Sequence, residues 1–127
     1  MAFRIRRADG HIDRFSAGTL VRADGRTIHL AADDVRMTPG GETWKSPRTG
    51  AVYPTAWRVD VKSAGLKLDV TTALRSQELA SRSGLTPSYW EGAVTARGQH
   101  GNTPVAAVGY LEMTGYDKAV NLTGPRR

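Results

Sequence analysis

The 127-residue sequence predicts an all-β fold, and three features carry that prediction. Apolar and polar residues alternate with a period of two in several short runs, as side chains do along a half-buried strand. Turn-forming Gly, Asp, Asn and Pro residues separate these runs at intervals of about 8 to 12 residues. No stretch carries the strong apolar stripe of an amphipathic helix. Together these features indicate a β-sandwich or an up-and-down barrel, and the pattern alone favours neither.

The first forty residues are predicted to form short strands joined by tight turns. Residues 2–7 alternate apolar side chains with arginine, which is typical of a strand. Residues 19–22 and 26–30 flank an Ala-Asp-Gly sequence, whose Asp-Gly step favours the positive backbone angles of a tight hairpin. Residues 33–38 are expected to form a further strand, which a Pro-Gly-Gly turn ends.

The middle of the chain combines a loop with the clearest alternation in the sequence. Residues 41–54 are rich in Pro, Gly, Ser and Thr, so we expect an ordered but irregular loop there. Residues 55–62 and 66–71 alternate apolar with polar side chains, which predicts an antiparallel pair with one face in the core and the other in water. Residues 72–82 are predicted to form a connection with about one helical turn, because their apolar stripe is weak.

The stretch 89–116 is the centre of the predicted fold, because two β-rich runs there flank a loop rich in Gly, Asn and Pro. Side chains alternate across a strand, so the first run separates Trp90 from Glu91. The second run separates Met113 from Glu112 in the same way. Each predicted strand thus carries one carboxylate near aromatic residues, and which face points inward stays open.

Several motifs along the chain resemble one known family. They are YWEGAV, GYLEMTGY, WKSPRTGAVYPTAW, SQEL and RRADGHIDRFSAGTLV, at residues 89–94, 109–116, 44–57, 76–79 and 6–21. They resemble the C-terminal half of the AttH and hydroxyneurosporene-synthase family, a group of lipocalin-like proteins that includes carotenoid 1,2-hydratases. The resemblance implies one lipocalin-like, calycin-like antiparallel β-barrel over residues 1–118, followed by a polar tail at 119–127. Members of the family usually have two such domains, and only the second is matched.

Composition excludes several other classes of protein. The chain has no cysteine, so disulfides and thiolate chemistry are excluded. The three histidines lack metal-ligand spacing, and no cofactor-phosphate or serine-nucleophile motif occurs, so we expect neither a metal nor a cofactor. The net charge of +6 comes without a nucleic-acid-binding motif, so no nucleic-acid partner is expected. We expect no membrane span and a cytoplasmic location, with a secreted or periplasmic one left open if the chain is a fragment.

Glu91 is the leading candidate for catalysis, together with Tyr89 and Glu112. If Glu91 points into an apolar chamber, burial favours its protonated form and makes it a general acid for an alkene or carbonyl. Glu112 could lie across from it on the partner strand and act as the base. The ordinary alternative places both glutamates on the solvent face. If Trp90 faces inward, Glu91 must face outward, so the two possibilities exclude one another.

Five aromatic residues are the candidates for ligand binding: Trp44, Tyr53, Trp57, Trp90 and Tyr110. Their rings could line a pocket for an elongated apolar molecule or stabilise a developing carbocation. The alternative is that they are core and loop anchors. Trp57 is the best candidate, because its face of the predicted strand is apolar.

Two hypotheses for function follow. The resemblance implies a cofactor-free hydratase or cyclase domain that binds a polyene, terpenoid or polyketide in a barrel cavity and acts by acid–base chemistry. The alternative is a non-catalytic module for an apolar ligand, or a structural half of a two-domain protein, so enzymatic activity stays open. An apolar small molecule is the expected partner, and homodimerisation could replace contacts with a missing N-terminal domain.

Overall fold

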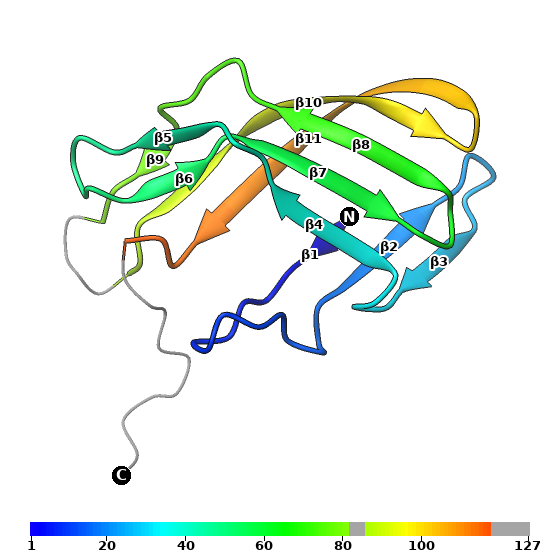
Figure 1. Ribbon diagram of the computed structural model, residues 1–127, viewed down its shortest axis with the longest axis horizontal. Coiled ribbons are helices and arrows are strands. Elements are labelled where there is room, and N and C mark those ends of the chain that lie inside the picture. The colour runs from blue at the N-terminus through cyan, green and yellow to red at the C-terminus, as the bar shows by residue number, and fades with distance from the viewer. Residues whose placement is uncertain (82–85, 118–127) are drawn as a thin grey trace, which may run out of the picture.

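The computed structural model describes residues 1–81 and 86–117, in which the strands form three antiparallel sheets (Figure 1). The strands are β1 (Ala2–Phe3), β2 (Ala17–Val21), β3 (Thr27–Leu30), β4 (Val35–Pro39), β5 (Thr43–Lys45), β6 (Val52–Pro54), β7 (Ala56–Val61), β8 (Leu66–Thr71), β9 (Glu78–Leu79), β10 (Tyr89–His100) and β11 (Thr103–Thr114). These two ranges contain no helix that is long and apolar enough to cross a membrane. The predicted tail at 119–127 lies outside the described residues, as does residue 118.

The largest sheet has the strand order β11-β10-β8-β7-β4, and β9 pairs with the start of β10 (Figure 1). It curls into half of a barrel, while β1, β2 and β3 form a second sheet and β5 pairs with β6. The sheet is open within the described residues, because β4 and β11 each have one neighbouring strand there. The predicted all-β, antiparallel fold is confirmed, in the form of a half-barrel.

Two predicted hairpins form where the sequence signals are strongest. β7 pairs with β8, and Trp57 and Val61 are buried while Arg58 between them is exposed. β2 pairs with β3 across the Ala-Asp-Gly turn. Gly25 in that turn has φ of 82°, a conformation that glycine adopts without strain. Local alternation and turn chemistry therefore suffice for these elements.

Two predictions about the connections are wrong. Residues 41–54 contain the β5–β6 hairpin instead of an irregular loop, with the rings of Trp44 and Tyr53 stacked at 6.1 Å between centroids. Each strand has only three residues, and the turn between them contains Pro, Thr and Gly. The composition of this segment is therefore typical of a loop, and the short strands could not be recognised from it. Residues 72–81 form no helical turn and instead contain β9, which is stabilised by pairing with β10.

The β10–β11 hairpin is longer than the sequence suggested. Its strands extend to a two-residue turn, Gly101 and Asn102, where a longer loop was expected. Gly101 has φ of 59°, as the first central position of a type II′ turn requires. At Gly98 an added Cβ would lie 1.9 Å from the carbonyl oxygen of Lys67. The backbones of β8 and β10 thus approach too closely there for a side chain.

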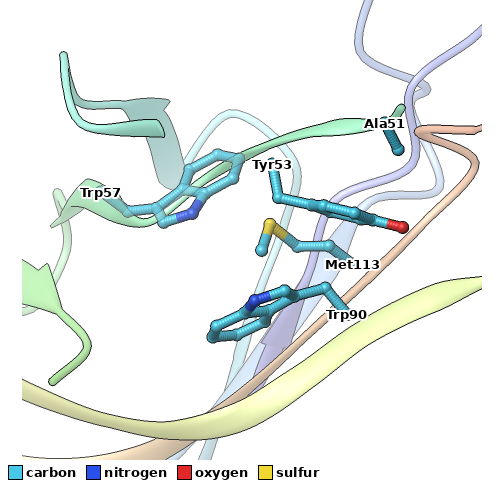
Figure 2. Packing of buried hydrophobic residues seen from close by; sticks show 5 residues of the cluster. All are labelled: Ala51, Tyr53, Trp57, Trp90 and Met113. Atoms are coloured by element: carbon cyan, nitrogen blue, oxygen red, sulfur yellow. The ribbon is translucent and has the colours of Figure 1, made fainter. Parts of the chain in front are cut away.

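Aromatic side chains dominate the core (Figure 2). Tyr53 and Trp90 are fully buried, and Trp57 is 9% exposed. Met113 packs with them, and the indole N–H of Trp90 donates to the carbonyl oxygen of Arg75 at 2.6 Å. That bond satisfies the only polar group of a buried indole. The cluster therefore joins β6, β7, β10 and β11.

Candidate functional site

The β10–β11 hairpin separates the predicted site residues onto two faces of the sheet. Directly paired residues of antiparallel strands share a face. Trp90 pairs with Met113, and both are buried, so we call this side the inner face. Glu91 pairs with Glu112 on the opposite side, the outer face. Trp90 and Glu91 therefore cannot line the same chamber.

The inner face holds four of the five predicted ligand-binding residues. Tyr53, Trp57 and Trp90 belong to one buried cluster (Figure 2). Trp44 packs against this cluster from a partly buried position. Tyr110 lies on the outer face and is 67% exposed. The four inner aromatic residues act here as core, and their contact with a ligand stays a prediction.

The outer face brings the three predicted catalytic residues together, so Glu91 does not point into the buried aromatic chamber in which its role as a general acid was predicted. Tyr89 and Glu91 lie on the same side of β10, and Glu112 is directly opposite Glu91 on β11. Tyr110 pairs with Ala93, one step along that face, and its phenol is close enough to interact electrostatically with the Glu91 carboxylate. The site thus contains two carboxylates and two phenols on neighbouring strands.

The two outer carboxylates have no counterion among the residues that the structure describes, since none of the ion pairs there includes Glu91 or Glu112. Partial exclusion of water, and then the negative charge of Glu91, raise the pKa of the Tyr110 phenol above its ordinary value. Tyr110 therefore keeps its phenolic proton at neutral pH. Like charges directly opposite each other destabilise a strand pair, so sheet stability does not explain this arrangement.

A third carboxylate, Glu78, lies on the inner face and was not predicted as a site residue. β9 pairs it with Trp90. Its carboxylate accepts hydrogen bonds from the hydroxyls of Ser46, of Thr49 at 2.5 Å and of Tyr53 at 3.0 Å. Burial, followed by the bond to Glu78 and its charge, raises the pKa of Tyr53 well above the usual range. These bonds fasten the β5–β6 hairpin to β9.

Two arginines of the N-terminal segment lie over the inner aromatic residues. The Arg4 guanidinium is 5.4 Å from the ring centroid of Trp57, and that of Arg6 is 5.3 Å from the ring of Tyr116. Arg4 also donates to the carbonyl oxygen of Met37 at 3.1 Å. Cation–π contacts of this kind occupy a ring face. The face of Trp57 is therefore already covered.

A hollow of about 570 Å³ lies over β7, β8 and β10, and most of the side chains that line it are charged. Arg58 and Asp69 form an ion pair across it at 3.1 Å. Such a lining does not suit an apolar ligand. Within residues 1–81 and 86–117, no three His, Asp or Glu side chains are grouped to hold a metal ion.

The curled antiparallel sheet defines the chain as a lipocalin-like β-domain. A family model described as AttH-like matches residues 1–116. The chain therefore belongs to the AttH-like family, as the motifs in its sequence predicted.

A crystal structure of a Nitrosomonas europaea protein assigned as AttH has the same fold, with a TM-score of 0.75 and 39% sequence identity. The match covers 91% of this chain and 34% of the N. europaea chain, so this chain spans about a third of its structural relative. No curated protein matches the sequence.

Proposed function

We propose that this domain holds an elongated apolar substrate, of the polyene, terpenoid or polyketide class, against the outer face of the β10–β11 hairpin and acts on it by acid–base chemistry. The observation that carries the proposal is the direct opposition of Glu91 and Glu112 beside the Tyr110 hydroxyl. Two carboxylates in one site can divide the roles of proton donor and proton acceptor. The substrate class comes from the resemblance to the carotenoid hydratases.

These side chains suit the addition of water to a carbon–carbon double bond. In the proposed step Glu91 acts as the general acid that delivers a proton to one alkene carbon, and the resulting carbocation is attracted by the rings of Tyr89 and Tyr110. Water attacks the cation, and Glu112 accepts the proton that this water releases. The product is an alcohol, and passage of a proton from Glu112 to Glu91 restores the starting state. In a cyclisation, a second double bond of the substrate replaces water as the nucleophile.

Exposed apolar side chains beside the carboxylates offer a surface for such a substrate. Val108 is 88% exposed and pairs with Thr95 on the outer face. Leu79 is also exposed and pairs with Tyr89. These two side chains lie on either side of the Glu91–Glu112 pair in the row of outer-face pairs. The N. europaea relative is longer than this chain, and further residues lying over this face would exclude water.

Glu91→Gln tests the proposed function, because it keeps the size of the side chain and removes the transferable proton. With an acyclic polyene as substrate, and mass spectrometry to detect the hydrated or cyclised product, we expect turnover to fall by about 100-fold or more. Polyene binding, followed by tryptophan quenching, should persist. Asp60→Asn, which neutralises a carboxylate of β7 away from the hairpin site, is the matched control. Unchanged turnover in Glu91→Gln would exclude the proposed chemistry.

A second candidate function is a non-catalytic module or structural half of a larger protein. It is favoured by the mutual burial of Tyr53, Trp57 and Trp90, which uses the aromatic surface as core. Saturable quenching without product from the unmodified chain would indicate a binding module. No quenching would indicate a structural half.

A further inference from the structure

We infer that the free edge of β11 pairs with β11 of a second copy of this chain, giving a two-fold symmetric dimer with one continuous sheet. β11 pairs with β10 on one side, and no strand of the described residues pairs with its other side. An unpaired edge presents a row of free N–H and C=O groups to any strand that can approach. This inference rests on the edge alone and does not depend on the proposed function.

The hairpin geometry identifies the backbone groups that face the free edge. The two-residue turn makes His100 and Thr103 the hydrogen-bonded pair that closes the hairpin. Bonded and non-bonded pairs then alternate, so the odd-numbered residues of β11 bond to β10. The even-numbered residues direct their N–H and C=O groups to the free side. Among these, Pro104 has no N–H, so the edge is blocked at one end only.

The rest of β11 lacks the features that protect the edges of natural sheets, which are lysines, bulges, prolines and short length. The strand has 12 residues, one proline at its start and one charged side chain, Glu112. Its register with β10 continues without a bulge along the whole strand. Val108 and Tyr110, both strongly exposed, lie at its centre. An apolar, regular edge of this kind is suited to pairing.

One register between two copies of β11 is favoured by the side chains. With Gly109 on the two-fold axis, Val108 of each copy pairs with Tyr110 of the other, so two exposed apolar side chains cover each other. Glu112 then lies opposite Ala106 and not opposite a second glutamate. Directly opposed like charges are thereby avoided.

The neighbouring registers are less favourable. Because only even-numbered residues face the edge, the axis moves in single steps from Gly109 to Val108 or to Tyr110. With Val108 on the axis, Pro104 of one copy lies opposite Glu112 of the other. Because proline has no N–H, one hydrogen bond between the two β11 strands is then lost. With Tyr110 on the axis, Glu112 lies opposite Val108, and a charge replaces the aromatic contact. With Gly109 on the axis, the proline lies at the frayed end of the pair.

Gly109→Cys tests this register directly, because the chain has no other cysteine. An added Cβ at Gly109 would contact Val94 at an ordinary 3.5 Å. Residues facing each other in a non-hydrogen-bonded pair have Cα atoms about 4.5 Å apart, which a disulfide can span. Under mild oxidation we expect a covalent dimer of twice the 13.7 kDa monomer mass. Ala107→Cys is the control, since its two copies would lie roughly 13 Å apart and stay unlinked.

Sedimentation of variants without cysteine gives an independent test. Val108→Lys places a charge opposite Tyr110 of the second copy, and Ala106→Pro removes an edge-facing N–H. We expect each to weaken self-association tenfold or more. Val21→Lys, at an exposed valine of β2, should leave it unchanged. A monomeric unmodified chain at high micromolar concentration, or equal cross-linking of Gly109→Cys and Ala107→Cys, would overturn the inference.

Discussion

The two faces of the β10–β11 hairpin carry similar side chains in opposite circumstances. On the inner face, the buried Trp90 has its N–H bonded to a carbonyl, and Glu78 accepts bonds from three hydroxyls. On the outer face, Tyr110 is exposed, and Glu91 faces a second carboxylate with no counterion in the described residues. Satisfied polar groups on the inner face hold the fold together, whereas the polar groups on the outer face are the ones that we propose for proton transfer.

Removing an inner aromatic ring should have the largest effect on stability. Trp90→Ala removes a fully buried side chain, so we expect the free energy of unfolding to fall by about 3 to 5 kcal/mol. Denaturant unfolding followed by circular dichroism measures the loss. Tyr110→Ala on the outer face should cause a much smaller change. Equal losses in the two variants would contradict the prediction that the inner face stabilises the fold more than the outer face does.

Neutralising a carboxylate should have opposite effects on the two faces. Glu78→Gln weakens three charge-assisted hydrogen bonds in a partly buried site, so we expect a loss of about 1.5 to 3 kcal/mol. Glu112→Gln relieves like-charge opposition and should raise stability by about 0.2 to 1 kcal/mol. Denaturant unfolding of both variants at neutral pH would measure these two changes. A destabilised Glu112→Gln would mean that the outer pair has a structural counterion.

Two glycines sharpen the comparison between the middle of the sheet and its edge. In Gly98→Ala the new Cβ meets the Lys67 carbonyl oxygen, which is backbone and cannot move aside, so we expect a loss of about 1 to 3 kcal/mol. Gly109→Ala at the edge meets only the end of the Val94 side chain and should change stability little. Thermal unfolding of both variants measures the difference. A tolerated Gly98→Ala would contradict the close approach of β8 and β10.

The last predicted effect is a dependence of stability on alkaline pH. Tyr53 keeps its proton to a higher pH when folded than when unfolded, because its pKa is raised in the fold. Its contribution is therefore fully present below about pH 10, the ordinary tyrosine value, and is lost as pH rises above it. Urea unfolding between neutral and alkaline pH should show this slope, and Tyr53→Phe should reduce it. If Tyr110→Phe reduces the slope as much as Tyr53→Phe does, the pH dependence would not be specific to the inner face.

The sequence predicted the fold best where each strand face has one chemical character. In β7 and β8 the apolar and charged residues alternate cleanly, and the structure confirms that hairpin. In β10 large aromatic residues lie on both faces, so alternation defined two sets without saying which one is buried. Contact with Tyr53 and Trp57, from other strands, makes the set containing Trp90 the buried one.

The role of Glu78 could not be predicted from local pattern. Its hydroxyl donors lie 25 to 32 residues earlier, next to strands of three residues that composition had indicated as loop. Two motifs of the family resemblance, at residues 44–57 and 76–79, meet at this contact. The resemblance of both motifs to one family was therefore the only signal in the sequence that linked residues 44–57 with residues 76–79.

The most direct test of the separation between the faces is to measure both turnover and the free energy of unfolding in Glu91→Gln. If the outer face carries the chemistry and the inner face the fold, turnover of the polyene is lost while stability stays within about 0.5 kcal/mol of the unmodified chain. Retained turnover together with a loss of stability of the size expected for Trp90→Ala would contradict the account.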